Sequence, residues 1–201
     1  MPFRIVPAVE GHGEVRAVPE LFRRIIAELN LGVPIDIRYP VRQSRDKLLK
    51  DGELERAVRI AAKEVAEEGA ILILIDSEGD CPAQLGPALL ARARTDQRIS
   101  VVLAHQEFEA WFLASASSLK GLRTLSDDIE NHQDPESLSG CKEWLESWMP
   151  RAQKYSETTD QAAFAATFDM SLARQNAPSF DKLWREFEAI CQHAKLVVGD
   201  D

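Results

Sequence analysis

Four short apolar runs, each separated from the next by a segment long enough for a helix, constrain the fold of this chain more than any other feature. The runs begin near Phe3, Pro34, Ala70 and Ile99. The gaps between them carry apolar residues at helical spacing, most clearly over residues 18–29. Strands that alternate with amphipathic helices are typical of βαβ units, in which neighbouring strands run parallel. We therefore predict an α/β fold with one crossover helix in each gap.

The apolar runs also indicate an order in the sheet. Residues 70–75 are apolar throughout, which favours a central strand, whereas residues 34–39 alternate apolar and polar side chains and favour a position nearer an edge. The predicted sheet is Rossmann-like, four-stranded and mainly parallel, and helices flank it. After Ser115 large apolar side chains become sparse before helical patterns resume. We predict an α/β domain at 1–115 and a helical C-terminal subdomain at 116–201 that packs on it.

Composition limits the classes of protein to which the chain can belong. Hydrophobic residues make up 45% and charged residues 28%, as in soluble globular proteins. No apolar run approaches the length of a membrane span, so we expect a cytoplasmic protein without a membrane partner. The three cysteines lack the spacing of a zinc knuckle or a disulfide framework. The net charge of −9 opposes a general phosphate-coating surface, so any contact with nucleic acid must be local and metal-assisted.

Carboxylates gather directly after the first and third apolar runs. Glu10 and Glu14 follow the first run, and Asp76, Glu78 and Asp80 follow the third. Because parallel strands open their carboxyl ends on one rim, where ligands bind, we expect the two acidic turns side by side. Closely spaced anions are held ionised by a divalent cation or by basic partners. The favoured interpretation is a Mg²⁺ or Mn²⁺ site, and the alternative is an acidic turn after a buried strand.

Two glycines shape the first acidic turn. Gly11 and Gly13 permit positive φ angles and a close approach of the backbone to a ligand. A dinucleotide-binding loop is disfavoured, because the third glycine of that fingerprint is missing and the flanking glutamates would repel a pyrophosphate. His12, between the glycines, is a candidate for proton transfer or substrate binding, or else it is simply a polar loop residue.

Further candidates follow the second and fourth runs on the same rim. Glu107 is a candidate metal ligand and Glu109 a weaker one, although acids in the first turn of a helix are favourable against its dipole whatever their function. Arg42 and Arg45 lie where they could contact a phosphate backbone beside the metal. The alternative for both arginines is an ordinary solvated basic surface.

The two acidic turns resemble a known domain. Val9-Glu10-Gly11 after the first run, followed by Asp76-x-Glu78 after the third, is similar to the Toprim domain of topoisomerases, primases and overcoming-lysogenization-defect nucleases. That resemblance implies a Toprim-like fold in which Glu10, Asp76 and Glu78 are the catalytic carboxylates. The chain departs from the DxD motif of that domain, because Glu78 stands where the motif has its second aspartate.

A closer resemblance covers nearly the whole chain. Five segments together are similar to a Toprim-like bacterial family, domain of unknown function 4276: EGHGE, LIDSEGDCP, HQEFEAW, KYSETTDQ and APSF. The fourth segment contains Lys154, which we expect beside the rim as a charge directed at a phosphate. The alternative is that Lys154 is an exposed residue near a helix start.

The predicted site combines these residues in three roles. The catalytic residues are Glu10, Asp76 and Glu78, the metal ligands are Glu10, Glu14, Asp76, Glu78, Asp80 and Glu107, and the substrate-binding residues are His12, Arg42, Arg45 and Lys154. The function that fits them is Mg²⁺- or Mn²⁺-dependent phosphoryl transfer, foremost by a Toprim-like nuclease. The alternative, which the family resemblance suggests, is a non-catalytic Toprim-like regulatory or binding partner of an ATPase encoded nearby.

Overall fold

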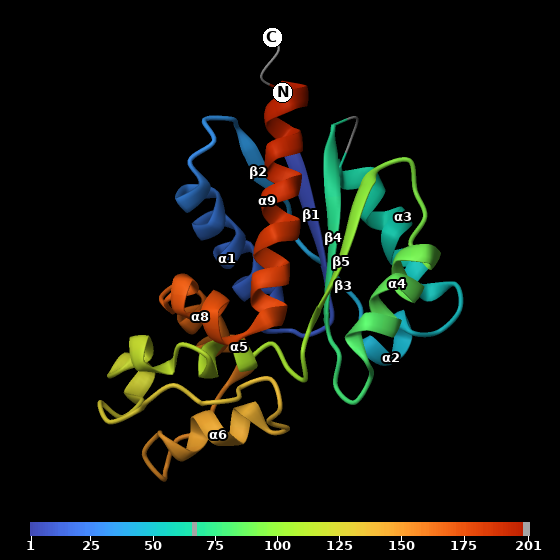
Figure 1. Ribbon diagram of the computed structural model, residues 1–201. Coiled ribbons are helices and arrows are strands. Elements are labelled where there is room, and N and C mark those ends of the chain that lie inside the picture. Colours follow the sequence, from blue (N-terminus) through green and yellow to red (C-terminus); the bar gives the residue numbers. More distant parts are fainter. Residues whose placement is uncertain (66–67, 199–201) are drawn as a thin grey trace.

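A parallel sheet forms the centre of the computed structural model, which describes residues 1–65 and 68–198 (Figure 1). Its strands are β1 (Phe3–Val9), β2 (Ile35–Ile37), β3 (Val41–Arg42), β4 (Gly69–Asp76) and β5 (Arg98–Ala104). The order is β2-β1-β4-β5, with β3 also paired to β1, and every one of these pairings is parallel. The predicted α/β fold with a parallel sheet and flanking helices is therefore confirmed.

The second apolar run, residues 34–39, forms the strand β2, and a further short strand, β3, follows just beyond it where a loop was predicted. β2 pairs with the start of β1, with Ile35 beside Phe3, and β3 pairs with its end, with Val41 beside Ala8. Pro40 lies between them and has no backbone N–H to donate to a neighbouring strand. The sheet therefore has five strands where four were predicted, although β2 and β3 share one edge of β1.

Long helices cover both faces of the sheet. Helices α1 (Glu14–Leu29) and α9 (Pro178–Val198) lie on one face, and α3 (Glu53–Val65) and α4 (Pro82–Arg92) lie on the other (Figure 1). The side chains of β4 alternate between the two cores with the period of a strand. Ala70, Leu72 and Leu74 join the core under α1 and α9, while Ile71, Ile73 and Ile75 join the core under α3 and α4. The burial of β4 on both faces explains its continuous apolar run.

The remaining elements are short and lie mostly beyond the carboxyl ends of the strands. They are α2 (Arg45–Leu48), α5 (Ala110–Leu113), η1 (Ala116–Leu119), η2 (Leu122–Thr124), α6 (Cys141–Ser147), the π-helix η3 (Glu157–Gln161), α7 (Ala162–Ala165) and α8 (Met170–Asn176). The C-terminal helix α9 contacts β4, β5 and α1, and its apolar residues belong to the same core as those of α1. The C-terminal segment thus covers the sheet, and the domain boundary at residue 115 stays a prediction.

Two exclusions made from the sequence concern disulfides and membranes. Cys81, Cys141 and Cys191 are all free thiols in the structure. Among the described residues, none of the helices combines the length and the apolar character that a membrane crossing requires. The cytoplasmic location stays a prediction.

Candidate metal centre

The candidate site lies where two adjacent strands of the sheet end. β1 and β4 are neighbours in the sheet. Helix α1, which follows β1, lies on one face of the sheet, and helix α3, which precedes β4, lies on the opposite face (Figure 1). In open α/β sheets, ligands bind at such a switch point beyond the carboxyl ends of the strands. Glu10 directly follows β1, Glu14 begins α1, and Asp76 is the last residue of β4. The topology therefore brings three carboxylates to one place.

These carboxylates converge closely. One oxygen from each of Glu10, Glu14 and Asp76 lies within 4.8 Å of the other two. Glu14 and Asp76 are only 3% and 8% exposed. Glu14 Oε2 accepts hydrogen bonds from the backbone N–H groups of Glu10 (3.0 Å) and Gly11 (3.3 Å), and Asp76 Oδ1 accepts one from Phe108 N–H (2.8 Å). Glu10 Oε2 is buried without a hydrogen-bond partner, which leaves it free to bind a ligand.

Burial and the charges of neighbouring carboxylates raise the pKa values of all three carboxyl groups. Burial, and then the charge of Glu10, raise the pKa of Glu14 from 4.5 to about 8. Burial also raises the pKa of Glu10 to about 7, and it raises that of Asp76 well above its usual range, with the charges of Glu14 and Glu10 adding to the effect. Without a cation the cluster therefore holds protons near neutral pH. A bound cation would displace them.

A fourth carboxylate, Glu109, lies behind the cluster. It is 1% exposed, and its Oε1 accepts hydrogen bonds from Tyr155 Oη (2.9 Å) and Gln161 Nε2 (3.2 Å). Burial raises the pKa of Glu109 to about 7, and its charge in turn raises the pKa values of Asp76 and Glu14. The sequence pattern ranked Glu109 below Glu107, whereas the structure puts Glu109 in electrostatic contact with the cluster.

Gly11 and Gly13 in the first acidic turn allow close packing; neither adopts a positive φ angle. Gly13 has φ −68°, and neither it nor Gly11 is among the positive-φ glycines. A Cβ atom on Gly13 would collide with Gln161 Oε1 and with the carbonyl oxygen of Glu157. The π-helix thus rests directly on the turn that carries Glu10. π-helical turns occur often at functional sites.

Lys142 supplies a positive charge beside the acids, and it was not among the site residues predicted from the sequence. Its Nζ lies 2.6 Å from Glu157 Oε1 and 3.9 Å from Glu107 Oε2. Its charge lowers the pKa values of Asp76 and Glu109, opposing the effect of burial. No local pattern pointed to Lys142, because only the folding of residues 116–140 brings it to the rim.

Comparison with known proteins assigns the chain to a family. The model of a family described as "Domain of unknown function (DUF4276)" matches residues 9–188. The chain belongs to this family. No curated protein and no solved structure matches it. The region matched to DUF4276 contains every carboxylate of the cluster as well as Glu109 and Lys142, and the predicted resemblance to this family is confirmed.

Two acids of the second turn bind an arginine in this DUF4276 chain. Arg45 Nη1 lies 3.3 Å from Glu78 Oε2, and Arg45 Nη2 pairs with Asp80. The same guanidinium donates to the carbonyl oxygens of Asp76 (3.0 Å) and Ser77 (3.1 Å), and its side chain is only 11% exposed. Arg45 therefore fixes the end of β4. Glu78 and Asp80 lie outside the group of three carboxylates, although the charge of Glu78 still raises the pKa of Glu10.

Two further predicted site residues, Glu107 and Arg42, form hydrogen bonds with backbone groups. Glu107 Oε1 accepts hydrogen bonds from the N–H groups of Gly140 (2.9 Å) and Cys141 (3.2 Å), so it caps the start of α6. Arg42 Nη1 donates to the carbonyl oxygen of Glu10 (3.2 Å), next to the cluster.

Two predicted substrate-binding residues are exposed. His12 lies exposed in the first acidic turn. Lys154 is 80% exposed and forms an ion pair with Glu146 (2.7 Å). The predicted approach of its segment to the rim is instead made by the neighbouring Tyr155, which donates to Glu109. Substrate binding by His12 and Lys154 stays a prediction.

Proposed function

We propose that this DUF4276 protein is a Mg²⁺- or Mn²⁺-dependent phosphoryl-transfer enzyme, with a Toprim-like arrangement of carboxylates and nuclease activity. The observation that carries the proposal is the convergence of Glu10, Glu14 and Asp76 within 4.8 Å at the switch point of the sheet. The unpartnered Oε2 of Glu10 is a second, independent sign of a ligand. In this proposal Glu14, and not Glu78, is the third carboxylate of the site.

The donor set fits a hard divalent cation. Its three members offer carboxylate oxygens, which Mg²⁺ and Mn²⁺ prefer, and no thiol or imidazole belongs to the cluster. Glu10, Glu14 and Asp76 would hold the ion. When bound, such an ion neutralises charge on a phosphoryl group and lowers the pKa of a bound water. The chain itself supplies Glu109, whose pKa of about 7 suits it to hold or release a proton near neutral pH.

A basic groove beside the cluster suits a phosphate backbone. A cavity of about 440 Å³ lies against β3 and α3, and its basic lining residues are Arg42, Lys47, Lys50 and Arg56. Arg42 joins the groove to the site, because its guanidinium contacts the carbonyl oxygen of Glu10. Local positive charge of this kind lets a protein of net charge −9 bind a polyanion at one place. Arg42 therefore keeps its predicted role, whereas Arg45 acts on the end of β4.

Calorimetric titration with Mn²⁺ tests the site, and cleavage assays test the function. Wild-type protein should bind Mn²⁺ and should cleave single- or double-stranded DNA or RNA in the presence of Mg²⁺ or Mn²⁺. Glu10→Gln and Asp76→Asn should lose both properties, because these substitutions keep the shape and remove the charge. Glu20→Gln is the matched control, since Glu20 lies on the exposed side of α1. Absence of Mn²⁺ binding by the wild type would overturn the proposal.

A second candidate function is a non-catalytic regulatory or binding partner of an ATPase. The observation that favours it is the ion pairing of Glu78 with Arg45, which removes the second acid of the Toprim-like motif from the cluster. A protein that binds Mn²⁺ through Glu10 and Asp76, yet cleaves no nucleic acid, would support this alternative.

A further inference from the structure

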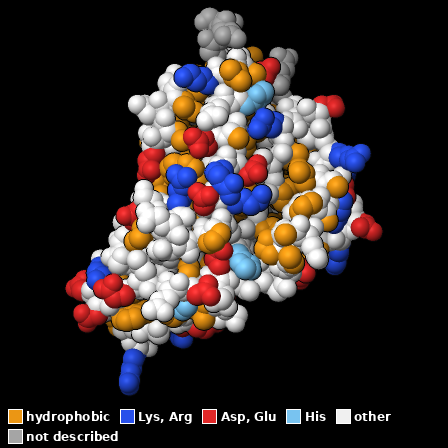
Figure 2. All heavy atoms as spheres, in the orientation of Figure 1, with side chains coloured by type: hydrophobic (Ala, Val, Ile, Leu, Met, Phe, Trp, Pro, Cys, Tyr) orange, Lys and Arg blue, Asp and Glu red, His pale blue; other side chains and the backbone are white. Residues whose placement is uncertain are grey.

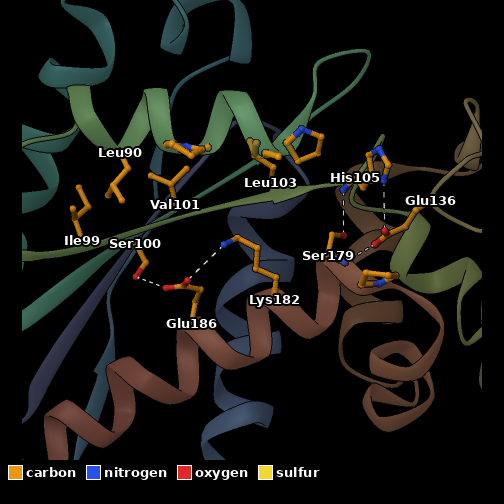
Figure 3. Close-up of a pocket in the computed structure, with 15 residues that line it drawn as sticks. Leu90, Ile99, Ser100, Val101, Leu103, His105, Glu136, Ser179, Lys182 and Glu186 are labelled. Carbon is orange, nitrogen blue, oxygen red and sulfur yellow. Dashed lines mark hydrogen bonds and ion pairs between the residues drawn. The ribbon is translucent and has the colours of Figure 1, made fainter.

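One edge of the sheet lies open in a groove. β5 pairs with β4 alone among the described strands, and a cavity of about 540 Å³ runs along its other side. Helix α4 borders the groove on one side and α9 on the other (Figure 3). Its apolar lining includes Leu90 of α4 together with Ile99, Val101 and Leu103 of β5. Figure 2 shows hydrophobic side chains gathered over β5 and α4, with basic side chains of the central helix beside them.

The polar side chains of this groove already have partners. Glu186 accepts a hydrogen bond from Ser100 Oγ (3.0 Å) and lies 3.6 Å from Lys182 Nζ (Figure 3). Glu136 lies 3.5 Å from His105 Nδ1 and accepts a hydrogen bond from the N–H of Ser179 (2.8 Å). A polar small ligand would therefore have to break existing contacts. The groove leaves open the side chain of Leu90, part of Ile99 and the edge of β5, which is a template for another strand; Val101 and Leu103 are themselves only 7% and 3% exposed.

We propose that a second copy of this chain occupies the groove, adding its own β5 antiparallel to the first about a twofold axis at Val101. The sequence of β5 suits such pairing, because an axis at Val101 sets Ile99 of each copy opposite Leu103 of the other. All three side chains face the core under α3 and α4. Apolar cross-strand pairs would then form on one face along the whole strand. The two sheets would become one continuous sheet.

The charges on α9 are self-complementary about the same axis. Because Glu186 contacts Ser100 while Ser179 Oγ accepts from His105 N–H (3.2 Å), α9 runs antiparallel to β5. Lys182 therefore lies four residues, or about 6 Å, beyond Glu186 toward the carboxyl end of β5. The twofold axis at Val101 places Ser100 of one copy opposite Val102 of the other. The position of Ser100 in one copy is therefore shifted from that in the other by two residues, or about 6.6 Å, along the strand.

These two shifts agree, so Lys182 comes opposite Glu186 of the partner subunit. Lys182 and Glu186, which pair with each other within one chain, would then also pair across the axis, and twice, because a twofold interface repeats every contact. Small residues of α4 that line the groove, Ala83, Gly86 and Pro87, leave space for the second copy of that helix. The charges of α9 and the apolar residues of β5 are thus both self-complementary about the same axis. This agreement favours a second copy of the chain over an unrelated peptide.

Sedimentation of the full-length chain tests the proposal directly. From about 1 to about 100 µM the wild type should shift from monomer to dimer. Leu90→Glu places a charge in the groove and should weaken the dimer about tenfold or more. Ile60→Glu is the matched control, because Ile60 on α3 is 45% exposed and Leu90 is 43% exposed. A monomer throughout this range, or equal effects of the two substitutions, would overturn the proposal.

Charge reversal tests the register. Lys182→Glu and Glu186→Lys should each weaken self-association, since each sets like charges opposite one another. An equimolar mixture of the two variants should form heterodimers, because each reversed charge then meets its opposite. Single variants that dimerise as tightly as the wild type would show that the axis does not lie at Val101. Retention of the wild-type circular dichroism spectrum checks that each variant is folded.

Discussion

Replacing Glu14 by glutamine should stabilise the metal-free protein at neutral pH. Glu14 has a pKa of about 8 in the folded protein and an ordinary value of 4.5 when the chain is unfolded. Between these two values the folded state holds a proton that the unfolded state has released. The free energy of unfolding therefore falls as the pH rises from 4.5 to about 8 and then becomes level. Glutamine cannot titrate, yet its carbonyl oxygen can still accept the hydrogen bonds from Glu10 and Gly11.

The size of the effect follows from the burial of Glu14. Each pH unit above 4.5 costs about 1.4 kcal/mol, so at pH 7 the buried carboxyl group costs about 3 kcal/mol. One kcal/mol corresponds to about 2–4 °C in the melting temperature of a chain of this size. The melting temperature of Glu14→Gln should thus exceed that of the wild type by about 6–12 °C at pH 7. Near pH 4.5 the two proteins should melt together.

Thermal unfolding followed by circular dichroism between pH 4.5 and 8.5 measures this difference. In wild-type protein, Mg²⁺ or Mn²⁺ at about 5 mM should oppose the fall at high pH, because a cation that binds the ionised cluster stabilises only the folded state. The cation should have little effect on Glu14→Gln. A wild-type melting temperature that stays level or rises between pH 5 and 8 without divalent cations would refute the reasoning. So would equal behaviour of Glu14→Gln and the exposed control Glu20→Gln.

Three further substitutions test the supports of the site by chemical denaturation. Gly13→Ala should destabilise the protein by about 1–3 kcal/mol, because its methyl group would collide with the π-helix; Gly79→Ala, which meets no atom within 4 Å, should have little effect. Arg45→Gln should cost about 1–3 kcal/mol, since the guanidinium holds two carbonyl oxygens at the end of β4. Tyr155→Phe should cost about 1–2 kcal/mol by leaving the buried Glu109 with one donor fewer. Stability within about 0.5 kcal/mol of the wild type would contradict each expectation.

The sequence by itself determined the architecture and two members of the cluster. Apolar periodicity is a local property, so it identified β1, β4 and β5 and the helices between them. Parallel strands joined by crossovers open on one rim, so Glu10 and Asp76 had to lie near each other once those strands were recognised. The strand β3 was missed because it has only two residues, lies beyond the second apolar run and forms by pairing with β1.

Only the tertiary structure decided which other residues join them. The sequence favoured Glu78 as a catalytic residue and offered Glu14 only as a metal ligand, but the first turn of α1 directs Glu14 inward, whereas Arg45 forms an ion pair with Glu78. Lys142 and Tyr155 reach the rim from segments more than 100 residues beyond Glu10 in the sequence. No spacing rule covers such distances, because the meeting of these side chains depends on how the whole C-terminal segment packs against the sheet.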